Sequence, residues 1–141
     1  MTRVEFFFNV EHKLQKLAEL SEKAVAKNVR LMVLAADEPS TAETQEYLWQ
    51  QALQFLPNYR LDDALAMTSP ILVDWRVDQI AHDEVLVNLQ DVQPTIFSRF
   101  RRLIEIVGMD EADKALARAR YKFYRDRGYE IKSYDASGKA L

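Results

Sequence analysis

Runs of apolar residues, separated by polar segments, predict a chain that alternates strands with helices. Runs that are apolar almost throughout, and rich in β-branched or aromatic residues, are typical of strands buried on both faces of a parallel sheet. Such runs lie at residues 4–8, 29–35, 71–73, 85–89 and 103–107, and a further edge strand is expected at 129–131. Where a helix joins two of these strands, we expect a right-handed crossover.

Helical periodicity marks the segments between several of these strands. Residues 11–28 carry apolar side chains on one face, and a second helix is expected to run from Thr41 to about Gln51. The last helix is expected to follow Asp110, a residue type that caps helix N-termini, and to end near Gly128. The pattern therefore predicts a single α/β domain over residues 1–132, with a mostly parallel sheet flanked by helices, and a flexible polar tail over residues 133–141.

The last predicted helix carries a stripe of basic and phenolic side chains. At about 100° per residue, five positions share one face: Lys114, Arg118, Tyr121, Lys122 and Arg125. We call these five residues the basic stripe. Small or apolar residues lie on the opposite face, which we expect to be buried: Ala112, Leu116, Ala119 and Phe123.

The charge of this helix contrasts with that of the rest of the chain. Residues 114–127 hold six Lys or Arg and one acid, a net charge of +5, whereas the whole chain carries −3 and the remainder therefore −8. Most charged helix faces are simply solvated. Because this one is cationic on an otherwise acidic protein and includes Tyr121, it is also a candidate docking site for an acidic partner.

Motifs for catalysis or cofactor binding are missing from the sequence. The loop after the first predicted strand has no glycine, and all three glycines lie near the C-terminus, so a phosphate-binding loop is excluded. There is no cysteine, and neither histidine has a partner at metal-ligand spacing. Asp37 and Glu38 could bind magnesium at a strand end, but a turn before a helix is the more usual role of such a pair. We therefore expect a non-catalytic protein with no cofactor and no metal.

Aromatic residues in the middle of the chain offer a second surface. We expect Trp49 to pack in the core, whereas Phe55 and Leu56, beside Pro57 in a predicted loop, could form an exposed apolar patch for a partner protein. No run approaches the roughly 20 apolar residues that span a bilayer, so we expect a cytoplasmic protein without a membrane contact.

Several of these segments resemble the chi subunit family of bacterial DNA polymerase III holoenzyme. The most specific is LARARYKFYRDRGY, which ends at Tyr129, and it is supported by VEFFFN, RLMVLAADEPSTAE, YLW and FLPN. The resemblance implies a nucleotide-binding-like α/β fold that lacks nucleotide chemistry. It also implies a role in DNA replication, in which chi connects the clamp-loader complex, through the psi subunit, to single-stranded DNA-binding protein.

The family resemblance also implies roles for particular residues. Lys114, Arg118, Tyr121 and Lys122 match the motif that binds the acidic C-terminal tail of single-stranded DNA-binding protein, a tail that ends in proline and phenylalanine. Arg125 joins them on helical phase alone, and Val107 and Met109 are expected as apolar neighbours of the bound ring. Phe55 lies in the segment that meets psi in the family, together with Leu56 and Pro57. DNA would then be contacted only indirectly, and the alternative is direct binding of single-stranded nucleic acid by the same stripe.

Overall fold

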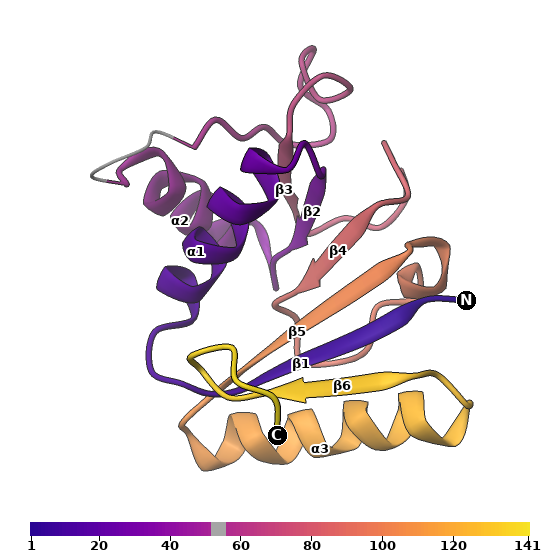
Figure 1. The fold of residues 1–141 in the computed structure, drawn as a ribbon. Helices are drawn as coiled ribbons and strands as arrows, with labels where there is room; N and C mark the ends of the chain where they lie inside the picture. Colours follow the sequence, from indigo (N-terminus) through magenta and orange to yellow (C-terminus); the bar gives the residue numbers. More distant parts are fainter. Residues whose placement is uncertain (52–55) are drawn as a thin grey trace.

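A computed structural model describes residues 1–51 and 56–141, which form one α/β domain (Figure 1). Its sheet has six strands in the order β3-β2-β4-β5-β1-β6, and every pairing between them is parallel. The strands are β1 (Arg3–Val10), β2 (Leu31–Leu34), β3 (Ile71–Asp74), β4 (Val85–Asn88), β5 (Arg102–Gly108) and β6 (Ile131–Tyr134). The helices are α1 (Lys13–Ala26), α2 (Glu38–Trp49) and α3 (Glu111–Asp126), with a 3-10 turn at Phe97–Arg99. The predicted fold class is confirmed.

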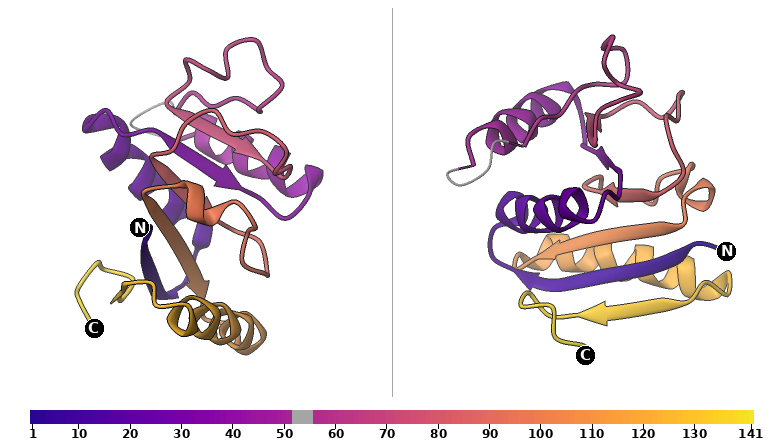
Figure 2. Two further views of the ribbon diagram at one scale, coloured as in Figure 1. Left: turned by 90° about the vertical axis from the view of Figure 1, so that its right-hand side faces the viewer. Right: turned by 45° about the horizontal axis from the view of Figure 1, so that its top comes forward.

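Helices cover both faces of the sheet, as Figures 1 and 2 show: α1 and α2 lie on one face and α3 on the other. Successive side chains of β1 point to opposite faces of the sheet and so enter different cores. Phe6 belongs to the core that includes Tyr124 of α3, whereas Phe7 belongs to the core that includes Leu17 of α1. Burial on both faces explains why the strands are apolar almost throughout.

On the α3 side, no α-helix among the described residues covers β2, β3 and β4, and loop segments complete the core there instead. Leu61 and Ala66 from the connection before β3, and Phe97 and Phe100 from the one before β5, pack into this core. Pro57 was predicted to exclude a regular strand, and the described part of that segment contributes only an isolated parallel bridge between Tyr59 and Leu72.

Two expectations about the middle of the chain are wrong. Trp49 is 41% exposed at the last position of α2 instead of lying in the core. Leu56 is only 1% exposed and packs in the core that includes Leu17, so it is not part of an exposed patch. Phe55 lies outside the described residues. No described helix combines the length and the apolar character that crossing a membrane requires.

Strand pairing continues beyond residue 132, where the domain was predicted to end. The boundary predicted at residue 132 falls inside β6, which runs parallel to β1 as far as Tyr134. Tyr134, the last residue of β6, also forms an antiparallel bridge with Ala140. The last residues of the chain therefore fold back beside β6.

Candidate functional site

The basic stripe is presented by α3, whose ends are defined by the residues that the sequence indicates. The Asp110 side chain accepts a hydrogen bond from the Asp113 N–H at 3.3 Å, as expected of an N-cap. After the helix, Gly128 adopts φ of +82°, and the Tyr129 N–H donates to the Tyr124 carbonyl at 3.2 Å. This turn leads directly into β6 and so fixes the position of α3 against the edge of the sheet.

The buried side of α3 differs from the predicted one. The helix buries Ala117, Arg120 and Tyr124, whereas Leu116, on the side expected to be buried, is 38% exposed. The other members of that predicted face are exposed or half-buried: Ala112, Ala119 and Phe123. The cause is that an arginine and a tyrosine, both with polar ends, are accommodated in the core by a buried acid.

That buried acid is Glu105 on β5, which is completely inaccessible to solvent. It accepts hydrogen bonds from Arg120 Nε at 3.0 Å, from the Tyr124 hydroxyl at 2.6 Å and from Asn88 Nδ2 at 3.1 Å. Arg120 also donates to the Asp91 carbonyl at 2.8 Å. Burial raises the pKa of Glu105 above its ordinary value, and the neighbouring Arg120 charge opposes that rise. Glu105, Arg120, Tyr124 and Asn88, hereafter the buried polar cluster, fix the rotation of α3 about its axis.

This rotation brings most of the basic stripe to a groove between α3 and the edge of the sheet. Arg118, Tyr121, Lys122 and Arg125 line the groove together with Phe8, Ser133 and Leu141, and its volume is about 650 Å³. The stripe therefore flanks the buried side of α3 instead of pointing directly away from it. As a consequence, its cations border a concave surface that β1 and β6 help to form.

Stacked aromatic rings support the floor of the groove. The Phe8 ring stacks on Phe6, with centroids 5.4 Å apart and an interplanar angle of 11°. The Tyr121 ring leans on the same Phe6, with centroids 5.3 Å apart and an angle of 55°. Because Phe6 is fully buried, both groove-lining rings are held by the core. The site thus combines a cationic rim with an apolar floor of fixed geometry.

The cations of the basic stripe differ in whether they already form an ion pair with an acidic side chain. Lys122 and Arg125 both contact Asp126, at 3.0 and 3.4 Å, and the hydrogen bond from Lys122 lowers the pKa of that acid. Lys114 lies 4.0 Å from Glu111 and does not line the groove. Within residues 1–51 and 56–141, Arg118 has no ion-pair partner. Arg118 is therefore the stripe cation most available to an added carboxylate.

Other predicted site residues lie away from the groove. Val107 is fully buried in the core on the α3 side, so the expectation that it borders a bound ring is wrong. Met109 is 52% exposed but immediately precedes the N-cap of α3, about three turns before Tyr121, and it does not line the groove. Pro57 is exposed in the connection between α2 and β3.

Three groove residues were not identified from the sequence. The sequence could have indicated Phe8, because it lies two residues after Phe6 and therefore on the same face of the predicted strand. Ser133 and Leu141 fall in the segment predicted to be a flexible tail. Their position depends on the pairing of β6 and on the turn that follows it, which no periodicity in the sequence indicates.

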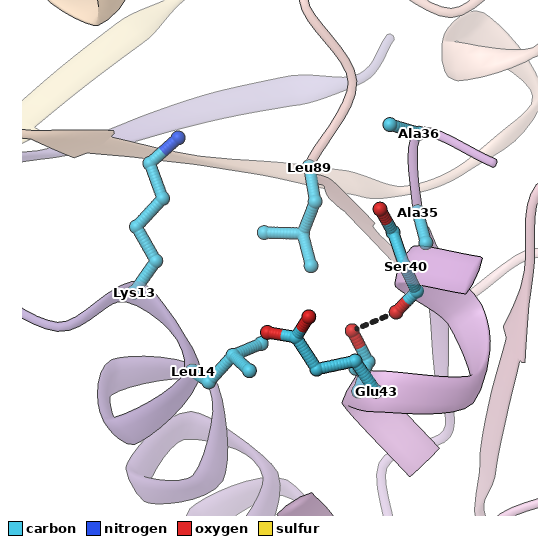
Figure 3. A pocket seen from close by; sticks show the side chains of 8 residues that line it. Lys13, Leu14, Ala35, Ala36, Ser40, Glu43 and Leu89 are labelled. Carbon is cyan, nitrogen blue, oxygen red and sulfur yellow. Dashed lines mark hydrogen bonds between the residues drawn. The ribbon is translucent and has the colours of Figure 1, made fainter.

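The usual ligand crevice of an α/β sheet, outside the carboxyl ends of the strands, is poorly suited to phosphate here. A hollow of about 250 Å³ lies there between α1, α2 and the residue after β4, and Leu14, Glu43 and Leu89 project toward it (Figure 3). The N-terminus of α2 is already capped by Asp37, which accepts from the Ser40 N–H at 2.9 Å. Lys13 is paired with Asp113 at 2.9 Å. No group of acids or histidines in the described part of the chain is arranged to hold a metal ion.

Comparison with known proteins relates the chain to one family. Residues 1–132 match the family described as DNA polymerase III chi subunit, HolC. The DNA polymerase III subunit chi of Pseudomonas aeruginosa is 27% identical over 139 residues, which cover 95% of this chain and 96% of that protein. The corresponding subunit of Haemophilus influenzae is 29% identical over 104 residues, 72% of each chain. That of Escherichia coli K12 is 23% identical over 119 residues, 83% of this chain and 81% of the relative.

The matched span includes β1, which supplies Phe8, and the whole of α3, which supplies the basic stripe and half of the buried polar cluster. The family resemblance of the LARARYKFYRDRGY segment thus extends over nearly the entire fold. The chain belongs to the family of the DNA polymerase III chi subunit, a component of the DNA replication machinery.

Proposed function

We propose that this protein is a non-catalytic subunit that holds the acidic C-terminal tail of single-stranded DNA-binding protein in the groove beside α3. Through a psi-like subunit it would connect that tail to the clamp-loader complex of DNA polymerase III. The observation that carries the proposal is the groove itself, in which three cations of the basic stripe surround an aromatic floor. A chain end with acids and a terminal aromatic residue has the complementary chemistry.

The cations would act on the carboxylates of the tail. Arg118 can form two parallel hydrogen bonds with one carboxylate because its guanidinium is planar. Lys122 and Arg125 would exchange their contacts with Asp126 for contacts with the ligand. Both pairs are exposed, with side-chain accessibilities of 69% for Lys122, 60% for Arg125 and 46% for Asp126, so breaking them costs little.

The apolar floor would receive the terminal phenylalanine ring. Phe8 and Tyr121 offer ring faces and edges at a fixed spacing, because both pack on Phe6. Burial of a phenyl ring supplies an attraction that salt does not screen, whereas the ion pairs at the rim are screened over about 8–10 Å at physiological ionic strength. We therefore expect moderate affinity, fast exchange and a partial dependence on salt.

The link to a psi-like subunit is proposed from the family resemblance and is supported by an exposed surface far from the groove. Trp49 lines a hollow of about 480 Å³ together with Gln45 and Arg60 at the opposite end of the sheet. An exposed tryptophan beside a hollow is typical of a protein-binding surface. Pro57 is exposed in the adjoining connection, and Phe55, which lies outside the described residues, is retained in the proposed contact.

Calorimetry with two tail peptides and one oligonucleotide tests the proposal. The full acidic peptide ending in phenylalanine should bind with one-to-one stoichiometry, and the peptide without its last residue should bind far more weakly, because only the former fills the aromatic floor. A single-stranded oligonucleotide should bind more weakly than the full peptide at the same salt concentration. Equal binding of both peptides, or preferred binding of the oligonucleotide, would instead favour a diffuse electrostatic surface for nucleic acid.

A further inference from the structure

Residues 135–141, hereafter the C-terminal arm, bring Leu141 to the groove. They lie beyond residues 1–132, the span that matches the family. In Figure 1 the chain leaves β6, turns, and returns alongside the end of β6. Leu141 lines the groove together with the stripe residues Arg118, Tyr121, Lys122 and Arg125 of α3.

Several independent contacts hold the C-terminal arm in this position. The Asp135 carboxylate accepts hydrogen bonds from the backbone N–H groups of Ser137, at 2.9 Å, and Lys139, at 3.1 Å. Gly138 turns the chain with φ of +89°. The Leu141 N–H donates to the Ser133 carbonyl at 2.9 Å, and Lys16 Nζ of α1 donates to the Ala136 carbonyl at 3.0 Å. The arm is therefore tied to its own turn, to β6 and to α1.

The Leu141 side chain borders the groove without filling it. It is 72% exposed, and the groove beside it still measures about 650 Å³. Phe8 and Tyr121 are the other apolar groups of the lining, so an apolar ring placed on them would also cover Leu141. An exposed leucine that a ligand buries contributes to the binding of apolar groups, because its surface is removed from water.

We propose that Leu141 is a specificity-determining residue of the groove, which recognises the terminal aromatic side chain of a bound acidic peptide. The inference rests on the proposed function, because it concerns the same ligand in the same groove. Leu141 is an exposed apolar residue of the lining, and the C-terminal arm holds its backbone beside Ser133. The cations of the basic stripe recognise the acids of the peptide and do not depend on Leu141.

A double-mutant cycle between protein and peptide tests the inference. Calorimetry compares wild type with Leu141→Ala, using an acidic peptide that ends in phenylalanine and the same peptide ending in alanine. We expect Leu141→Ala to weaken binding of the phenylalanine peptide by about threefold to tenfold and to leave binding of the alanine peptide unchanged. Gly138→Val, which strains the turn without changing charge, should act in the same direction.

Leu65→Ala is the matched control, because Leu65 is also an exposed leucine, at 52%, and does not line the groove. It should leave the affinities of both peptides unchanged. Equal losses for both peptides in Leu141→Ala, or no loss for either, would overturn the role of Leu141 while the proposed function stands. If wild type binds neither peptide, the proposed function fails and this inference fails with it.

Discussion

Arginine and tyrosine side chains occupy two different environments on α3, depending on the side of the helix from which they project. Arg118 and Tyr121 line the groove, whereas Arg120 and Tyr124 enter the core and bind Glu105. Both interior side chains are hydrogen-bonded to Glu105, which is the condition under which charges tolerate burial. In the proposed function, residues that bind the partner and residues that position the helix therefore lie within one short segment of α3.

Replacing Arg120 tests the positioning role at the level of a single residue. Arg120→Met keeps the length of the side chain but leaves the Glu105 carboxylate buried without its cation. We expect the free energy of unfolding, measured with urea, to fall by about 3–5 kcal/mol. Arg125→Met, on the exposed side of the same helix, should change it by less than about 0.5 kcal/mol. Similar stabilities for the two variants would show that the buried polar cluster does not secure α3.

Strands and helices differ in how far the sequence predicts them. Each central strand was located because burial on both faces makes it apolar almost throughout, and the ends of α3 were located by Asp110 and Gly128. The rotation of α3 about its axis was not predicted from the sequence. Apolar periodicity cannot indicate a buried arginine, because the acid that pairs with it, Glu105, lies in another element. Helical phase grouped four residues that line the groove, Arg118, Tyr121, Lys122 and Arg125, but their neighbours Ser133 and Leu141 depend on long-range pairing of β6.

The junction between α3 and β6 gives an element-scale prediction. Gly128 joins the two elements with a left-handed backbone, φ of +82°, which a β-carbon disfavours. We expect Gly128→Ala to lower the free energy of unfolding by about 1 kcal/mol in urea titrations. Gly128→Asn should lower the free energy of unfolding by less, since asparagine tolerates this conformation better than alanine does. Equal losses for both variants would mean that the junction is not limited by its backbone conformation.

Across the whole molecule, the two candidate partner surfaces lie at opposite ends of the sheet. The groove borders β6, the last strand at one edge, whereas Trp49 ends α2, which packs near β3 at the other edge. Figure 1 shows α3 with β6 and α2 with β3 on opposite sides of the molecule. Two proteins could therefore bind at once without overlapping, as a connecting subunit requires. Outside residues 114–127 the chain carries a net charge of −8, which limits its attraction to nucleic acid.

Charge reversal at Arg118 tests the central claim most directly. Titration of the acidic tail peptide into Arg118→Glu is compared with titration into Arg99→Glu, which makes the same charge change at an exposed arginine outside the groove. Circular dichroism and urea unfolding verify that both variants remain folded. We predict that Arg118→Glu loses at least about a hundredfold in affinity and that Arg99→Glu binds nearly as wild type does. An unchanged affinity in folded Arg118→Glu would contradict the assignment of the groove as the site that holds the tail.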